Sequence, residues 1–307
     1  MESSTGCIAD DGLQDFADEL LTFFLNHYPQ REGGKIVFEP SGVGDQWNYV
    51  RNSTEFICAM KMLLPRIISL GKRREWDVGL LNKWEAMLTA IPPIPGGRLL
   101  SEPEWHIALG DLLVPAEDMS KRDPKFRRGS QQPELYPIWP GKLVLREPTD
   151  FDMAVRSYHA RRSTHAAVEG WVLDVAFAVC LGLDEDADRW FDYHFDAVNV
   201  FPCGLAQEHS RKQDTCEAIP VFASMQGLGS SVVPVYERLL QDYADEIIVL
   251  PCWPIDRSVR YALFSPFAGR VTLDYDAQSA VCNFTTQFPI KVSLRKKWQG
   301  KVKLVEK

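Results

Sequence analysis

The chain has 307 residues, 45% hydrophobic and 25% charged, a balance typical of a soluble globular protein with one large domain or two ordinary ones. Its formal net charge of −8 disfavours binding to a phosphate backbone, and no stripe of Lys and Arg with interleaved aromatic residues offsets that charge, so nucleic acid is not an expected partner. No apolar run approaches the roughly 18 residues of a membrane span, and the polar, acidic N-terminus does not resemble a signal peptide. The sequence as written therefore predicts a cytoplasmic protein without a membrane partner, and a truncated N-terminus would leave an extracellular location open.

The seven cysteines are odd in number and include no C-x-x-C pair. Buried thiols are therefore expected, rather than a disulfide framework or a zinc site. No phosphate-cradling glycine loop, metal-spaced pair of histidines or nucleophile-elbow serine occurs either. The sequence predicts no cofactor and no metal.

The first third of the chain predicts three helices. Residues 12–27 place apolar side chains three and four positions apart, the stripe of a helix that lies on a core. Asn52 is the expected N-cap of a second helix, with Glu55 at its third position. The expected buried stripe of that helix consists of Phe56, Met60, Leu63, Ile67 and Leu70. A third helix is expected from about Asp77 until a run of prolines ends it.

The middle of the chain changes character twice. Residues 96–141 are rich in Pro, Gly and short apolar pairs, which predicts loops and short strands inserted over a helical scaffold. Helices are expected again in three segments, 149–162, 168–181 and 184–198, the second of them apolar nearly all round. A long irregular stretch, 201–229, then precedes a last helix at 230–243. Loops of that length in compact domains are usually functional or disordered.

After Asp245 the sequence alternates and is rich in β-branched residues, a pattern that predicts strands. The expected strands are 247–250, 259–263, 270–275, 280–285 and 290–294. We therefore divide the chain into a helical portion, residues 1–244, and a small antiparallel β domain, residues 245–307.

Acidic residues in the predicted loops could carry glycoside hydrolysis, which needs one carboxyl group to protonate the leaving oxygen and a second to activate water or attack. Asp45 lies in a turn-rich loop beside Trp47 and Asn48, and a Trp next to an acid can form a platform for a sugar ring. Asp45 is therefore a candidate general acid. A surface Asp in a turn is the alternative reading.

Several short motifs follow one another in an informative order. They are Pro-Glu-Leu-Tyr at 133–136, Gly170-Trp171 followed by Asp174, and a Gly/Ser-opened helix that runs into an apolar strand and Pro-Cys-Trp-Pro at 251–254. In this order, and over most of residues 15–275, they resemble the six-hairpin (α/α)-barrel glycosidases, in particular relatives of glycoside hydrolase family 95. The resemblance implies a mainly α fold, a partial α/α toroid of helical hairpins finished by the C-terminal β domain.

The resemblance also implies roles for individual residues. Asp45 would be the general acid, since the family has a Glu near this position, and Trp47 and Trp171 would be sugar platforms or pocket walls. Further substrate contacts would come from Asn48, Glu134, Tyr136, Asp174 and His209. For Glu134 and Tyr136, a turn with a core aromatic residue is the alternative.

The match breaks at the catalytic base. The family places an Asp eleven residues before the Glu that corresponds to Glu237, and this chain has Gln226 there, which would serve as a substrate contact. An amide cannot take a proton from water, so either the base has moved or hydrolysis is lost. Asp214 and Glu217 are the nearest substitutes, in a loop that could instead simply be hydrated.

These features predict a glycoside hydrolase-like protein that acts on a glycan and, if active, hydrolyses a terminal sugar with inversion. The alternative is a carbohydrate-binding or assembly module that has lost its general base, and a lyase or phosphorylase on the same scaffold is a third reading. Because the family carries a β-sandwich and further helices ahead of the matched region, a missing N-terminal half or a second chain is expected to complete the ring.

Overall fold

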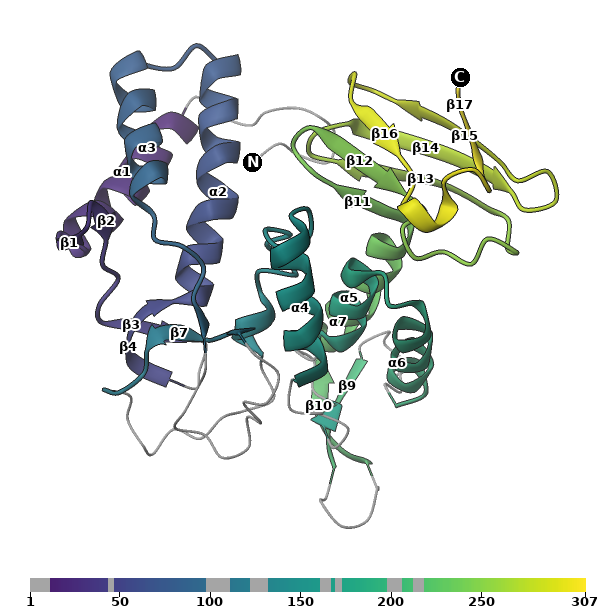
Figure 1. The fold of residues 1–307 in the computed structure, drawn as a ribbon, viewed down its shortest axis with the longest axis horizontal. Helices are drawn as coiled ribbons and strands as arrows, with labels where there is room; N and C mark the ends of the chain where they lie inside the picture. Colours follow the sequence, from purple (N-terminus) through teal and green to yellow (C-terminus); the bar gives the residue numbers. More distant parts are fainter. Residues whose placement is uncertain are drawn as a thin grey trace. The chain divides into compact units, whose positions relative to one another are not determined.

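The computed structural model describes residues 12–43, 47–97, 111–121, 132–160, 167–168, 173–197, 206–211 and 218–307 (Figure 1). The chain divides into an N-terminal unit, Asp10–His165, and a C-terminal unit that contains Ala166–Lys307. Each unit has a hydrophobic core of its own. The expected boundary between residues 244 and 245 falls inside the C-terminal unit, in the turn between two paired strands.

The N-terminal unit is built on the helices α1 (Leu13–His27), α2 (Thr54–Arg73) and α3 (Val78–Ala90). The predicted first and third helices are confirmed, and Asp77 caps α3 by accepting a hydrogen bond from the Leu80 amide at 2.8 Å. The inner faces of the three helices meet around the fully buried Trp84. Because short helices are marginal alone in water, this shared apolar core is what stabilises them.

The start and the buried face of α2 differ from the prediction. Ser53 is the N-cap, since its Oγ accepts from the Phe56 amide at 3.4 Å. Asn52 takes a left-handed φ of 49°, and its side chain accepts from the Phe38 amide at 2.8 Å and donates to Glu117. The buried residues of α2 are Thr54, Ile57, Cys58, Met60, Leu64, Ile68 and Gly71. Apolar side chains occupy most of the circumference of α2, so the stripe alone could not determine which face packs.

Short strands connect the helices of the N-terminal unit. The two-stranded pairs are β1 (Arg31–Glu32) with β2 (Lys35–Ile36), and β5 (Gly96–Gly97) with β6 (Leu112–Leu113). The three-stranded sheet is β3 (Ser41–Val43), β4 (Trp47–Ser53) and β7 (Ala116–Asp118). The unit also contains the 3-10 helix η2 (Pro133–Leu135) and the helix α4 (Pro148–Ala160). The loops and short strands predicted for residues 96–141 are confirmed where that segment is described.

The C-terminal unit begins with the helices α5 (Asp174–Leu181), α6 (Asp184–Ala197) and α7 (Met225–Leu239). Every residue of α5 is buried, and α5 packs against both α6 and α7. The C-terminal unit also contains a short three-stranded sheet of β8 (Ala167–Val168), β9 (Ala206–Arg211) and β10 (Ala218–Ser224). Paired strands therefore occupy part of the stretch 201–229 that was predicted to be irregular. Among the described residues of both units, no helix combines the length and apolar character that crossing a bilayer requires.

The strands predicted after Asp245 are confirmed (Figure 1). They are β12 (Glu246–Val249), β13 (Val259–Ser265), β14 (Gly269–Asp276), β15 (Val281–Thr286) and β16 (Lys291–Ser293). Two further strands, β11 (Leu240–Asp242) and β17 (Lys303–Glu306), were not predicted. The sheet orders are β11-β12-β16 and β13-β14-β15-β17, and the expected all-antiparallel pairing is wrong because β12 pairs with β16, and β15 with β17, in parallel. The chain leaves one sheet after β15, adds β16 to the other, and returns through η3 (Lys296–Trp298), which sets these directions.

A buried polar network joins α5 to the strands of this unit. Arg295 donates to the carbonyl of Cys180 and, at 2.9 Å, to Oε1 of Gln241. Gln241 in turn donates to the carbonyl of Val179 at 3.2 Å. Gly182 ends α5 in the left-handed region, with a φ of 71°, and a Cβ there would lie 2.5 Å from Arg295 Nη1. The last turn of α5 is therefore held by hydrogen bonds as well as by apolar packing.

The predicted fold class, a mainly α partial toroid of helical hairpins, is wrong. The described residues form a mixed α/β structure in which small sheets of two to four strands alternate with the helices. A toroid requires helical hairpins in succession. Here β3 and β4 precede α2, three short strands follow α3, and the β9–β10 hairpin separates α6 from α7. The short strands satisfy their backbone groups by pairing, β5 with β6 and β9 with β10, and α5 buries its apolar surface against α6 and α7.

Candidate ligand-binding site

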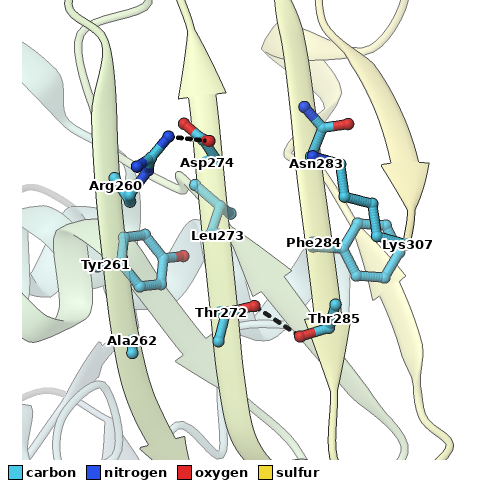
Figure 2. Close-up of a pocket in the computed structure, with 10 residues that line it drawn as sticks. All are labelled: Arg260, Tyr261, Ala262, Thr272, Leu273, Asp274, Asn283, Phe284, Thr285 and Lys307. Carbon is cyan, nitrogen blue, oxygen red and sulfur yellow. Dashed lines mark hydrogen bonds and ion pairs between the residues drawn. The ribbon is translucent and has the colours of Figure 1, made fainter.

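The four-stranded sheet of the C-terminal unit carries a shallow hollow of about 540 Å³ on its outer face (Figure 2). A volume of this size is typical of small-molecule sites. The hollow is lined by Arg260, Tyr261, Ala262, Thr272, Leu273, Asp274, Asn283, Phe284, Thr285 and Lys307. These residues belong to β13, β14, β15 and the position directly after β17.

The strand register places the polar side chains of the hollow in two rows. Arg260, Asp274 and Asn283 are direct cross-strand partners, and so are Ala262, Thr272 and Thr285 in the next row on the same face (Figure 2). Successive side chains of a strand point to opposite faces. The residues between these rows therefore point the other way, towards the core.

The core side of the sheet makes the hollow a fixed platform. Leu273 and Tyr275 are buried, and Tyr261 packs against the same cluster. The Tyr261 hydroxyl donates to the carbonyl of Leu239 at 2.8 Å, and the Tyr275 hydroxyl donates to that of Ile255 at 2.6 Å. Burial raises the pKa of both phenols above the ordinary value. The backbone under the hollow is thus anchored by apolar contacts and by two hydrogen bonds from its inner face.

On the outer face the polar groups are paired across strands. Arg260 Nη2 donates to Asp274 Oδ2 at 2.6 Å, and the hydroxyls of Thr272 and Thr285 lie 2.6 Å apart (Figure 2). The hydrogen bond to Asp274 raises the pKa of the Arg260 guanidinium, and the charge of that carboxylate acts in the same direction. The Arg260 side chain is nevertheless 79% exposed, so most of its donors face solvent. The side-chain amide of Asn283 makes no hydrogen bond within the described part of the chain.

This arrangement suits binding better than acid–base catalysis. Hydroxyl, amide and guanidinium groups offer donors and acceptors to a polar ligand on a rigid face. The lining includes one acidic side chain, that of Asp274, and it is engaged by Arg260. Glycoside hydrolysis needs two carboxyl groups with different protonation states, so the groups of the hollow do not form such a pair.

The catalytic residues predicted from the sequence lie outside the described part of the chain. These are Asp45, Asp214 and Glu217, and the predicted sugar platform Trp171 lies outside it as well. Their predicted roles therefore stay predictions.

Three further predicted contacts are placed by their backbone alone. Trp47 opens β4, His209 lies in β9 opposite Pro220 and Val168, and Gln226 lies in the first turn of α7. The side chains of these three residues are outside the described part. Gln226 was expected in an irregular loop before a helix and instead belongs to the helix, where the chain from Met225 onward continues without a break.

The remaining predicted contacts differ in accessibility. Asn48 is exposed on β4, and Tyr136, which directly follows η2, is half-buried. Glu134 lies buried within η2, and Asp174 lies buried at the start of α5. Burial of these two carboxyl groups fits structural positions in their units. The predicted contacts also divide between the two units, with Asn48, Tyr136 and Glu134 in one and Asp174 in the other.

Sequence reasoning missed the outer face of the β13–β14–β15–β17 sheet. The signal was present as alternation, because Arg260, Thr272, Asp274 and Asn283 each stand between apolar neighbours in a predicted strand. We used that alternation to predict strands and left the polar positions unassigned. Only the strand register shows that the polar positions of three strands come together on one face.

The chain matches no protein-family model, and a search of curated proteins finds no significant match. The inferred resemblance to six-hairpin (α/α)-barrel glycosidases, in particular family 95, is wrong. The mixed α/β fold contradicts it, and no family match supports it. The motifs behind the resemblance are short strings of Pro, Gly and apolar residues that also suit ordinary turns and element ends, as Pro-Glu-Leu does here by forming η2.

Proposed function

We propose that the C-terminal unit is a carbohydrate-binding module and that the hollow on the β13–β14–β15–β17 sheet holds the saccharide. The observation that carries this proposal is the rigid outer face on which a guanidinium, an amide and two hydroxyls stand within two cross-strand rows. Saccharides present closely spaced hydroxyls that both donate and accept, which such a set of groups can satisfy. A fixed backbone lowers the entropic cost of binding a polar ligand.

The same groups favour binding over hydrolysis. Asp274 accepts a hydrogen bond from Arg260 at 2.6 Å, so this carboxylate is already engaged by a guanidinium. Among the described residues, no second carboxyl side chain lines the hollow. Retention of a glycan without its cleavage is the behaviour that this chemistry supports.

The test is isothermal titration of the intact protein with a panel of plant and microbial oligosaccharides, both neutral and acidic. Asn283→Ala removes an uncommitted amide, and losing one such hydrogen bond should weaken binding roughly twofold to tenfold. The matched control is Gln278→Ala, which removes an exposed amide from the turn after β14, outside the hollow. Equal effects of the two changes, or no binding by the parent protein, would remove the proposal.

A parallel assay addresses hydrolysis. The parent protein and Asp45→Asn are incubated with aryl glycosides and with any oligosaccharide that binds, and release of sugar is measured. Binding without release supports the module. Release that Asp45→Asn abolishes would replace it with a glycoside hydrolase whose acid is Asp45.

A further inference from the structure

The outer face of the β13–β14–β15–β17 sheet carries more positive than negative side chains, although the whole chain is acidic. By strand register, the basic residues on this face are Arg260, Arg270, Lys303 and Lys307, and the acidic residues are Asp274 and Asp276. The carboxylate of Asp276 is engaged by the turn that follows β14, where it accepts from the Ser279 hydroxyl at 2.7 Å and from the backbone N–H of Gln278 at 3.0 Å. Positive charge on a face of an acidic protein attracts anionic ligands selectively.

The basic groups stand around the threonine pair. Arg260 lies in the row next to Thr272 and Thr285, and Lys307 follows β17 at the other side of the hollow. From β13 to β17 there are three strand spacings, roughly 14 Å at the usual separation. Arg270 lies one row further along β14. An anion bound over the two hydroxyls would therefore have a cation on each side.

Arg260 is already oriented for this role. Its Nη2 is held by Asp274, which fixes the plane of the guanidinium while the side chain stays 79% exposed. A guanidinium that keeps donors facing solvent can bind a carboxylate with two parallel hydrogen bonds. Lys307 makes no ion pair with a described residue, so its ammonium group is open to contact a second anionic group of the ligand.

We infer that the saccharide bound in the hollow is acidic, and that Arg260 and Lys307 bind its carboxylate groups while Thr272, Thr285 and Asn283 bind its hydroxyls. This inference rests on the proposed carbohydrate-binding function and adds the chemical class of the ligand. Asp274 is a positioning residue, because it acts on the ligand through the guanidinium of Arg260.

The test compares two oligosaccharides of equal length, oligogalacturonate and neutral galacto-oligosaccharide, by isothermal titration of the full chain. We expect tighter binding of oligogalacturonate, and a loss of roughly tenfold for Arg260→Gln and for Lys307→Gln, as expected for removal of a charge-assisted hydrogen bond. Lys296→Gln makes the same change of net charge at an exposed position in η3 and should leave the affinity unchanged. Raising the salt concentration should reduce the preference for oligogalacturonate, because salt screens exposed charges.

The outcomes separate this inference from the function on which it rests. Equal affinity for the acidic and the neutral oligosaccharide, each weakened by Asn283→Ala, would overturn the acidic ligand and keep the carbohydrate-binding module. Binding of neither would overturn both. Unchanged circular dichroism spectra of Arg260→Gln and Lys307→Gln would show that these exposed substitutions leave the fold intact, and an affinity unchanged by both of them would also overturn the inference.

Discussion

Replacement of Gln241 by Leu should destabilise the C-terminal unit through the loss of a buried hydrogen-bond network. Gln241 is fully buried and donates to the carbonyls of Val179 at 3.2 Å and Glu237 at 3.4 Å. Its Oε1 accepts from Arg295 at 2.9 Å. Leu has a similar volume but none of these groups, so the substitution leaves the packing nearly unchanged and removes the polar contacts.

The expected loss of stability follows from the hydrogen bonds that the substitution removes. A buried neutral hydrogen bond contributes about 0.5–1.5 kcal/mol and one to a charged group about 1.5–3 kcal/mol, and the bonds of one network are not additive. We therefore expect Gln241→Leu to lower the free energy of unfolding by about 2–5 kcal/mol, a large share of the roughly 5–15 kcal/mol of an ordinary domain. Arg295 retains its bond to the Cys180 carbonyl, which limits the loss.

The assay is hydrogen exchange measured by mass spectrometry, because it locates the loss within the chain. Peptides from α5, β11 and β12 should exchange faster in the variant, and peptides from α2 and α3 should not. Gln278→Leu makes the same chemical change at an exposed turn and should stay within about 0.5 kcal/mol of the parent. A Gln241→Leu protein as stable as this control would refute the reasoning, and so would equal losses in both units.

Three other predictions concern single positions. Gly182→Ala and Gly300→Ala both place a Cβ on a residue with left-handed φ, at a cost of about 1–2 kcal/mol. Only at Gly182 would that Cβ meet Arg295, so urea unfolding should show a greater loss of stability for Gly182→Ala. Equal losses of stability in the two variants would contradict the clash with Arg295. Asp77→Ala should cost about 1 kcal/mol through loss of the α3 cap, and Asp77→Ser should recover most of it in the same assay. Burial raises the pKa of Cys282 to about 12, so the folded protein binds the thiol proton more tightly than the unfolded chain does. The free energy of unfolding should therefore fall as the pH rises from about 8.5, the ordinary pKa of a thiol, to about 12, the pKa in the folded protein. Denaturation at a series of pH values should show that the free energy of unfolding falls less steeply with pH in Cys282→Ala than in the parent. The same slope in both proteins would contradict the role of Cys282.

Local patterns predicted the elements better than their assembly. The helix at 12–27 and the strands after Asp245 follow from the spacing of apolar side chains, which is a property of neighbouring residues. The start of α3 was predicted at about Asp77, and the structure shows that Asp77 caps this helix by accepting from an amide three residues away. The N-cap of α2 was missed by one residue because Asn52 is used by Phe38 and Glu117, which are distant in the sequence.

The candidate site could not be predicted from spacing alone. The sequence shows that Arg260, Asp274 and Asn283 alternate with apolar residues, but not that they are opposite one another. That placement depends on the register of β13, β14 and β15. A shift of one residue would turn every one of these side chains towards the core, so the register and the burial of the inner face together decide the site.

The amino-acid sequence by itself determined where most helices and strands form, because helical and strand periodicities and caps are set by residues within a few positions of one another. It also determined the acidic character of the chain and the burial expected for its apolar residues. Only the tertiary structure decided that small sheets replace a ring of helical hairpins, that β15 pairs in parallel with β17, and that a basic, polar face is assembled on one sheet. These outcomes depend on which distant segments pair and pack, and the gain from burying one apolar face against another is not encoded in any single segment.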